Sequence, residues 1–111
     1  MTREIKFRAW DGKKVKKDIH ISLFKDGWSV EGIDKGDVIL MQYTGLKDEN
    51  GVEIYEGDVV ETPSQAICKI TYSKDHYCGF VAEEIRGNWH WNISQIEVTV
   101  IGNIYENPEL L

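Results

Sequence analysis

Two cysteines and three histidines are the residues of this 111-residue chain best suited to metal binding or nucleophilic catalysis. Structural zinc sites commonly show Cys-x2-Cys or His-x3–5-His spacing, which is absent from the candidate ligands Cys68, His76, Cys78 and His90. His76 lies two residues before Cys78, so a regular strand places both on one face, but catalysis also needs a group that orients the base. We expect no metal site and no catalytic residue here, and free thiols, because the first residues contain no apolar export signal.

The nineteen acidic residues show no recognisable ligand or acid–base pattern. The segment Asp48–Gly51 is rich in oxygen ligands, but an EF-hand loop has glycine at position 6 and glutamate at position 12. Gly51 stands at position 4, so a turn is the simpler interpretation. Neither standard glycine-rich phosphate loop is present. We therefore expect a protein that is not an enzyme and that has no small-molecule cofactor.

Trp89 and Trp91 are the strongest candidates for a binding surface, because alternate residues of a strand share a face. Exposed aromatic residues on a small β-barrel stack single-stranded bases. Bulky aromatic residues of small β-domains more commonly line the core or a protein interface. Both interpretations remain open from the sequence.

Basic residues are concentrated at the start of the chain. Residues 1–25 have a net charge of +5 and the remainder has −11, giving −6 overall. This balance provides no general attraction to a polyanion. The basic stretch either contacts phosphates or an acidic partner, or lies against the acidic body of its own chain or a neighbour. Four lysines flank a predicted hairpin turn at Asp11–Gly12 and are further candidate binding residues: Lys13, Lys14, Lys16 and Lys17.

Alternation of apolar and polar residues is the dominant pattern, and helical periodicity is nearly absent. Ile5, Phe7 and Ala9 alternate with more polar neighbours, and Asn50–Gly51 is expected to supply the positive-φ pair of a tight hairpin turn. The run 38–43 is apolar on both faces and should form a central strand. Further strands are expected at 19–23, 28–30, 52–55, 59–60, 66–72, 77–83, 89–91 and 96–105, and Asn107–Pro108 suits either one helical turn or a docked tail. The predicted fold is mainly β, with short antiparallel strands and hairpins forming a small barrel or curled sheet and little helix.

Three stretches together resemble the YopX family of phage and prophage proteins: Arg3–Trp10 (REIKFRAW), Met41–Val60 (MQYTGLKDENGVEIYEGDVV) and Val100–Leu111 (VIGNIYENPELL). The resemblance implies a phage or prophage origin, a location in the cytoplasm of a bacterial host, and a mainly β fold. It favours a single YopX-like domain over 1–111, with an N-terminal β lobe of about 1–45 and a C-terminal small β-barrel of about 52–111 as a possible subdivision. The family carries no established activity, so no catalytic residue is implied.

Together these observations predict a non-enzymatic phage or prophage accessory protein that binds a protein partner, its own copies included, through a sheet edge or aromatic patch. The alternative is a single-stranded nucleic-acid-binding β-barrel that uses the basic residues with Trp89 and Trp91. No membrane partner is expected, because the longest apolar run, Val38–Met41, is far shorter than the ~20 residues of a membrane span.

Overall fold

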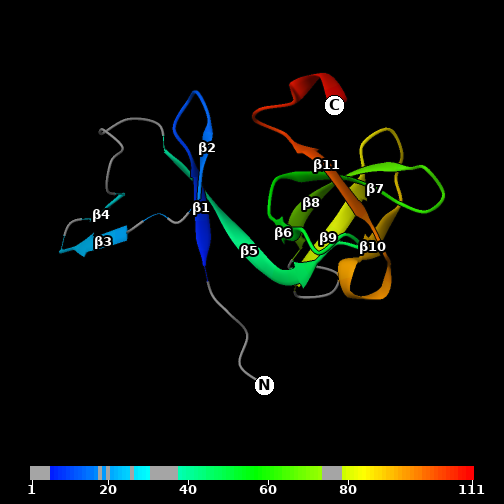
Figure 1. Cartoon of the computed structure of the whole chain (residues 1–111), viewed down its shortest axis with the longest axis horizontal. Helices are drawn as coiled ribbons and strands as arrows, with labels where there is room; N and C mark the ends of the chain where they lie inside the picture. Colours follow the sequence, from blue (N-terminus) through cyan, green and yellow to red (C-terminus); the bar gives the residue numbers. More distant parts are fainter. Residues whose placement is uncertain (1–5, 18, 20, 26, 31–37, 74–78) are drawn as a thin grey trace.

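The computed structural model describes residues 6–17, 19, 21–25, 27–30, 38–73 and 79–111. The described residues form antiparallel strands in three sheets, with two short 3-10 turns as the helical content. The predicted mainly β fold, built from short strands and hairpins, is confirmed (Figure 1). No helix among these residues is long and apolar enough to cross a membrane.

The N-terminal sheet has four strands in the order β2-β1-β5-β6. It comprises β1 (Phe7–Trp10), β2 (Val15–Lys16), β5 (Ile39–Lys47) and β6 (Glu53–Tyr55). The predicted turn at Asp11–Gly12 joins β1 to β2, because the Asp11 carboxylate accepts hydrogen bonds from the backbone N–H groups of Lys13 and Lys14. The long strand β5 pairs with β1 and then with β6, which confirms its predicted central position.

The C-terminal sheet has five strands in the order β10-β9-β8-β7-β11 and contains the main apolar core. Its strands are β7 (Asp58–Glu61), β8 (Ile67–Ser73), β9 (Gly79–Glu84), β10 (His90–Asn92) and β11 (Thr99–Asn103). The sheet curls around the core, and the β5–β6 hairpin covers it with Leu46 and Ile54 (Figure 1). The core residues are Ile54, Val60, Cys68, Ile70, Phe80, Ala82, Ile93 and Val98.

Strands β3 (Ile21–Phe24) and β4 (Gly27–Val30) form a separate two-stranded sheet, close to the two strands predicted there. The strand β5 pairs with two partners along its length: its first residues pair with β1 and its last residues pair with β6. The division into an N-terminal lobe and a C-terminal barrel stays a prediction.

The turn at Asn50–Gly51 differs from the expected type. Gly51 has a φ of +83°, but Asn50 is not in the positive-φ region, so the prediction of a positive-φ pair is wrong. The Asp48 N–H donates to the Val52 carbonyl, which makes a three-residue loop of 49–51. Such loops need a single left-handed residue, and the Asp48 carboxylate supports this one by accepting from the backbone N–H groups of Asn50 and Val52.

The strand predicted at 96–105 is shorter than expected, because β11 covers only Thr99–Asn103. A bulge interrupts its pairing with β7 between Val100 and Gly102. The Asn103 carboxamide oxygen then accepts from the N–H groups of Tyr105 and Glu106, which turns the chain away from the sheet. Of the two alternatives left open after Asn107–Pro108, the chain forms the helical turn, which is the 3-10 turn η2 (Pro108–Leu110). A second 3-10 turn, η1 (Ile93–Gln95), follows β10.

Candidate functional site

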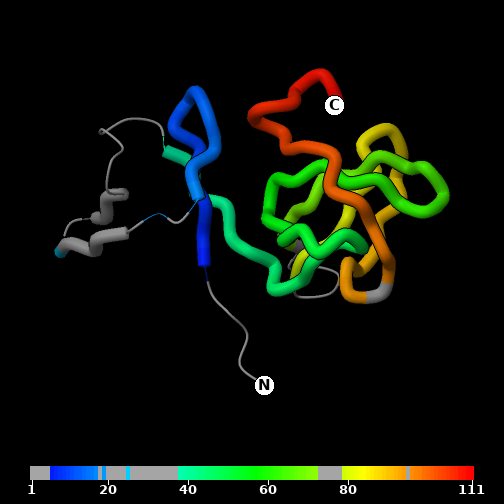
Figure 2. Tube along the Cα trace, in the orientation of Figure 1, coloured from blue at the N-terminus to red at the C-terminus, as the bar shows by residue number. Residues whose placement is uncertain are grey.

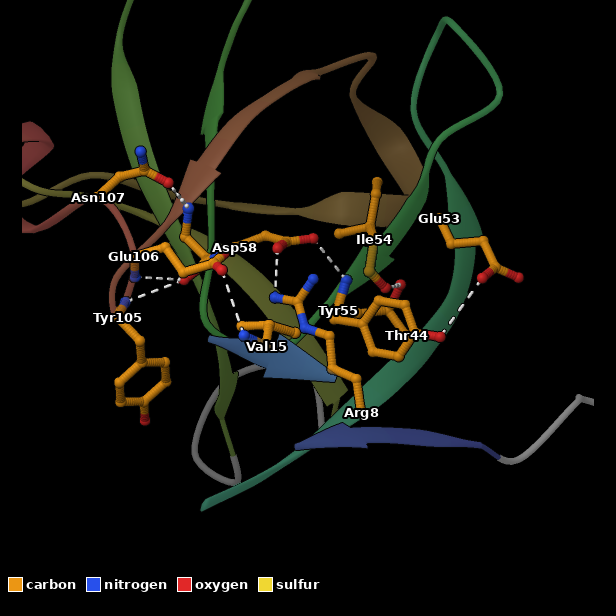
Figure 3. Close-up of polar contacts among 11 residues, drawn as sticks. Arg8, Val15, Thr44, Glu53, Ile54, Tyr55, Asp58, Tyr105, Glu106 and Asn107 are labelled. Atoms are coloured by element: carbon orange, nitrogen blue, oxygen red, sulfur yellow. Dashed lines mark hydrogen bonds and ion pairs between the residues drawn. The ribbon is translucent and has the colours of Figure 1, made fainter. Parts of the chain in front are cut away.

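A buried ion pair between Arg8 and Asp58 joins the N-terminal strand β1 to the start of β7, fifty residues away. The Arg8 Nη2 atom lies 2.5 Å from Asp58 Oδ1, and the two residues are 5% and 1% exposed. Asp58 Oδ2 accepts a hydrogen bond from the Tyr55 N–H at 2.8 Å. The Arg8 guanidinium also lies over the Tyr55 ring, 4.6 Å from its centroid (Figure 3). Asp58 therefore has a partner for each carboxylate oxygen.

The turn between β6 and β7 places Asp58 because it contains a glycine that no other residue replaces well. Gly57 has a φ of +89° and is buried. A Cβ atom added at Gly57 would lie 3.1 Å from the Met41 sulfur, so both the backbone conformation and the space favour glycine. The sequence Tyr55-Glu56-Gly57-Asp58 thus brings the Asp58 side chain back to the Tyr55 N–H.

A second polar connection attaches β2 to the segment that follows β11. Glu106 Oε2 accepts from the Val15 N–H at 3.2 Å, and Glu106 Oε1 accepts from the Asn103 side-chain amide at 2.9 Å. Trp10 stacks on Tyr105 with ring centroids 5.7 Å apart. Figure 2 shows the C-terminal segment passing beside the β1–β2 hairpin. The hairpin is therefore held at both β1 and β2.

The contacts around Arg8, Asp58 and Glu106 form a polar junction between the β1–β2 hairpin and the rest of the chain. Its surroundings shift the pKa values of the two carboxyl groups in opposite directions. Burial raises the pKa of Asp58 above its ordinary value, and the Arg8 charge and the Tyr55 N–H offset part of that shift. The hydrogen bonds from Asn103 and Val15 lower the pKa of Glu106. Arg8 Nε is buried and has no hydrogen-bond partner among the described residues. A buried donor without an acceptor costs about 1–3 kcal/mol.

A polar cavity of about 260 Å³ lies beside this ion pair. Its charged and amide-bearing lining residues come from five separate segments of the chain, which only the fold brings together. They are Arg8, Lys17, Glu53, Asp58, Asn103, Glu106 and Asn107, accompanied by Val15, Val52, Val100 and Gly102. A cavity of this size accommodates a small polar molecule or a single side chain.

The structure separates the four candidate lysines. Lys13 and Lys14 are exposed at the tip of the β1–β2 hairpin. Lys16 forms an ion pair with Asp11, with its Nζ atom 3.5 Å from the carboxylate. Lys17 is the member of this group that lines the cavity. Together with the pairs Lys6–Glu53 and Arg8–Asp58, this arrangement favours the interpretation that part of the basic stretch lies against the acidic body of its own chain.

The two candidate tryptophans have different environments. Trp91, on β10, is half-buried and packs against the core, whereas Trp89 is 63% exposed. Their rings meet edge to face with centroids 6.4 Å apart. In Figure 1, β10 lies on the far side of the molecule from the β1–β2 hairpin. The structure therefore brings the tryptophans together but does not bring them to the lysines.

The cysteine chemistry considered from the sequence finds little support among the described residues. Cys68 is a free cysteine with no exposed surface, and burial raises the pKa of its thiol to about 11. His76 and Cys78 lie outside the described residues. Within the described ranges, no three His, Cys, Asp or Glu residues gather closely enough to hold a metal ion.

Sequence reasoning did not identify Arg8 and Asp58 as site residues. Arg8 occupies a polar position in an alternating strand, which predicts a solvent-facing side chain, and Gly57–Asp58 indicates only a turn. Neither pattern names a partner fifty residues away. The one available signal was the resemblance itself, because both residues lie within matched stretches.

Comparison with known proteins agrees with this fold. The family model described as YopX protein matches residues 13–111. The chain belongs to the YopX family. Among solved structures, this YopX protein is similar to protein EF1440 from Enterococcus faecalis, with 29% identity, 99% of each chain covered and a TM-score of 0.67. It also shares its fold with protein yopX from Bacillus subtilis, with 20% identity, 99% of each chain covered and a TM-score of 0.69. Comparison with curated proteins gives no significant match.

Proposed function

We propose that this YopX protein is a non-enzymatic phage or prophage accessory protein that binds a protein partner in the cytoplasm of a bacterial host. The observation that carries the proposal is the exposed indole of Trp89, which rests against Trp91 at the terminal strand of the five-stranded sheet. The partner is either a different protein or a second copy of this chain.

Tryptophan is among the residues that contribute most binding free energy at protein interfaces, because its large rigid ring loses little conformational entropy on binding. Trp89 is fixed in place by the edge contact with Trp91, and its carbonyl accepts a hydrogen bond from the Glu84 N–H. This preorganisation supports the role of an anchor that enters a pocket on a partner.

Two glutamates near Trp89 disfavour a nucleic acid as the partner. Glu83 lies opposite His90 across the β9–β10 pair, and Glu84 is bonded through its N–H to Trp89. Both glutamates retain some exposure. Carboxylates repel phosphates, and the four candidate lysines belong to the β1–β2 hairpin. A nucleic-acid base stacked on Trp89 would have Arg86 of the same loop and Lys69, which is paired with Glu83, as the nearby basic residues.

The non-enzymatic part of the proposal is supported by the state of the groups best suited to catalysis. The Cys68 thiol is buried and its pKa is raised to about 11, which disfavours the reactive thiolate. The Asp58 and Glu106 carboxylates each have both oxygens engaged by donors of the chain itself. These groups act as structural acceptors in this arrangement.

The test is a pull-down from the lysate of an infected or lysogenic host, with and without nuclease. Three baits are compared: the native protein, Trp89→Ser, and Tyr72→Ser as a matched control that removes another exposed aromatic residue. A protein that survives nuclease treatment, binds the native protein and the control, and is lost with Trp89→Ser supports the proposal. Circular dichroism confirms that each bait is folded.

Two results would count against this function. Equal capture by all three baits would show that Trp89 is not the anchor. Retention of nucleic acid, with proteins lost on digestion, would support the single-stranded nucleic-acid-binding barrel instead. Light scattering of the native protein and Trp89→Ser over a range of concentrations distinguishes self-association from binding of a different protein.

A further inference from the structure

We infer that the edge of β5 beside Leu40 binds an extended segment of a protein partner, which adds a strand to the N-terminal sheet and places an apolar side chain in a neighbouring cavity. The surface consists of the free edge of β5 and the cavity next to that edge. It is separate from Trp89 and goes beyond the proposed function.

The directions of the backbone groups along β5 follow from its pairing with β1. The Tyr43 N–H donates to the Lys6 carbonyl. In an antiparallel pair, residues that bond to the neighbouring strand alternate with residues whose backbone groups point away from it. Gln42 and Leu40 therefore point their N–H and C=O groups to the edge opposite β1. The Gln42 carbonyl confirms this direction, because it accepts a hydrogen bond there from the Glu56 N–H.

The edge at Leu40 is open because β6 does not continue along the first residues of β5. β6 pairs with the last residues of β5, and after Glu56 the chain turns at Gly57 into β7. On this side of β5, no backbone hydrogen bond joins Leu40 to another described residue. One N–H donor and one C=O acceptor therefore remain for an incoming strand, and open backbone groups of this kind are the template for strand addition.

A cavity of about 290 Å³ lies along this edge, and most of its lining is apolar. A Cβ atom built at Gly57 would lie 3.1 Å from the Met41 sulfur and 3.6 Å from the Tyr105 ring, so both side chains border the cavity beside Gly57. The Tyr105 ring points away from the Arg8–Asp58 pair, on the side opposite the polar cavity (Figure 3). The apolar lining residues are Ile39, Leu40, Met41, Ile70, Ile104 and Tyr105. In strand-addition complexes, pockets of this kind take alternate side chains of the added strand and provide specificity.

The unpaired charge of the cavity lining is that of Glu56. This residue is half-buried, and no ion pair or hydrogen bond joins its carboxylate to another described residue. The other charged lining residue, Lys69, is paired with Glu83. The whole chain has a net charge of −6, which has the same sign as Glu56. Charge complementarity therefore favours a bound segment in which an apolar residue has Lys or Arg as its neighbour.

The test begins with a phage-displayed library of random seven-residue peptides that is selected on the native protein. The enriched peptides should share an apolar residue next to Lys or Arg. Two-dimensional nitrogen–proton NMR then locates a synthetic copy of an enriched peptide. The Leu40 amide resonance should show a saturable shift, because this N–H gains a hydrogen bond. The Tyr43 amide resonance should shift less, because its N–H is already bonded to Lys6.

Strand addition is tested directly with copies of this peptide that are each N-methylated at one residue, since methylation removes a backbone donor. Affinity should fall by at least about tenfold when the methylated residue faces β5, and by less than about threefold at the residues on either side. The losses should therefore alternate along the peptide.

The variant Glu56→Gln should weaken the peptide affinity by about fivefold, because the basic residue of the peptide loses its charged partner. Glu61→Gln is the matched control, since it removes an equal charge outside the cavity lining, and it should change the affinity by less than about twofold. The Trp89→Ser protein should bind the peptide unchanged, so failure here is distinguishable from failure of the proposed function.

Four results would overturn the inference. They are a library that enriches no such peptide, a Leu40 resonance that does not move, methylation losses that do not alternate, and equal losses in the two glutamate variants. A Leu40 resonance that shifts with protein concentration alone would identify a second copy of this chain as the occupant and would equally overturn the assignment to a different protein.

Discussion

The apolar core of the five-stranded sheet and the polar junction around Arg8 hold the molecule together in different ways. Val60, Cys68 and Ile70 are almost fully buried in the core and contribute through loss of water contact, which is non-directional and roughly proportional to area. At the junction, Arg8, Asp58 and Glu106 each have specified partners. A core of this kind tolerates graded changes, whereas a buried ion pair fails sharply when one partner is removed.

The core and the junction therefore have different structural roles. Packing of the core accounts for the stability of the curled sheet, because most of the deeply buried apolar residues lie there. The directional bonds of the junction fix where β1 and β2 lie relative to β7 and the segment after β11. We therefore expect the free energy of unfolding to fall most when a buried charge loses its partner and less when a buried hydrogen bond is lost. It should fall least when a methylene group is removed from the core or an exposed charge is neutralised.

Arg8→Met should have the largest effect, because it leaves Asp58 buried without its cation. We expect the free energy of unfolding to fall by about 3–5 kcal/mol. Urea unfolding monitored by tryptophan fluorescence measures this change, since Trp10 stacks on Tyr105 next to the junction.

The double variant Arg8→Met with Asp58→Asn separates loss of the pair from loss of packing. The asparagine oxygen retains an acceptor for the Tyr55 N–H and introduces no charge. The double variant should recover at least half of the stability lost in Arg8→Met. If the stability losses of the two substitutions are instead additive, the ion pair is not the source of the loss in Arg8→Met. The junction would then not differ from the core in the way proposed.

Asp48→Asn should have the next largest effect. Asp48 is buried, and its carboxylate accepts from the N–H groups of Asn50, Val52 and Val100, so it joins the β5–β6 loop to β11. An asparagine has one acceptor oxygen and would turn an N–H₂ group toward one of these donors. The expected loss is about 1–3 kcal/mol at neutral pH, measured by urea unfolding.

The pH dependence of this loss tests its electrostatic origin. Burial acts to raise the pKa of Asp48, but the three backbone hydrogen bonds outweigh it and place the pKa below the ordinary value of 3.8. The stability due to Asp48 is therefore fully present above about pH 3.8 and is lost as the pH falls through the lowered pKa. The difference in free energy of unfolding between the native protein and Asp48→Asn should decrease when the pH falls below this value. A difference that stays constant would show that the shape of the Asp48 side chain, not its charge, provides the stability.

Local pattern predicted much of the fold, because alternation and turn residues act over a few neighbours. The strand expected at 66–72 corresponds to β8, and Asp11–Gly12 forms the expected hairpin turn. The end of β11 was missed because the Asn103 side chain, which accepts from the N–H groups of Tyr105 and Glu106, turns the chain away from the sheet. The loop at 49–51 was misjudged because the Asp48 side chain, not the Asn-Gly pair alone, sets its length.

The candidate site was less predictable than the fold, because it is formed by residues far apart in the sequence. Alternation places Arg8 on a polar face, but β7 and the segment after β11 approach β1 from that side, so Arg8 becomes buried. The same limit applies to the tryptophans. Spacing places Trp89 and Trp91 on one face, and only the packing of the core decides that one is exposed and the other half-buried.

Ile70→Val tests the core side of the comparison. Ile70 is 1% exposed within the apolar cluster, so the change removes one methylene group and leaves a small cavity. The free energy of unfolding should fall by about 0.5–1.5 kcal/mol. Urea unfolding should show an unchanged dependence on denaturant, because the fold stays the same. A loss as large as that of Arg8→Met would contradict the view that the core responds in a graded way.

Lys69→Gln should have the smallest effect, because it removes a charge pair that water already screens. The Lys69 Nζ atom lies 4.0 Å from the Glu83 carboxylate, and the two side chains are 41% and 50% exposed. Exposed pairs of this kind contribute little, so we expect a change below about 0.5 kcal/mol that disappears at high salt. Urea midpoints of the native protein and the variant at low and high salt measure it. Lys69 and Glu83 face each other across β8 and β9, but their pair is both more exposed and longer than the 2.5 Å contact between Arg8 and Asp58. A loss above about 1 kcal/mol at Lys69 would therefore show that the contrast between the junction and the rest of the molecule depends neither on burial nor on close contact.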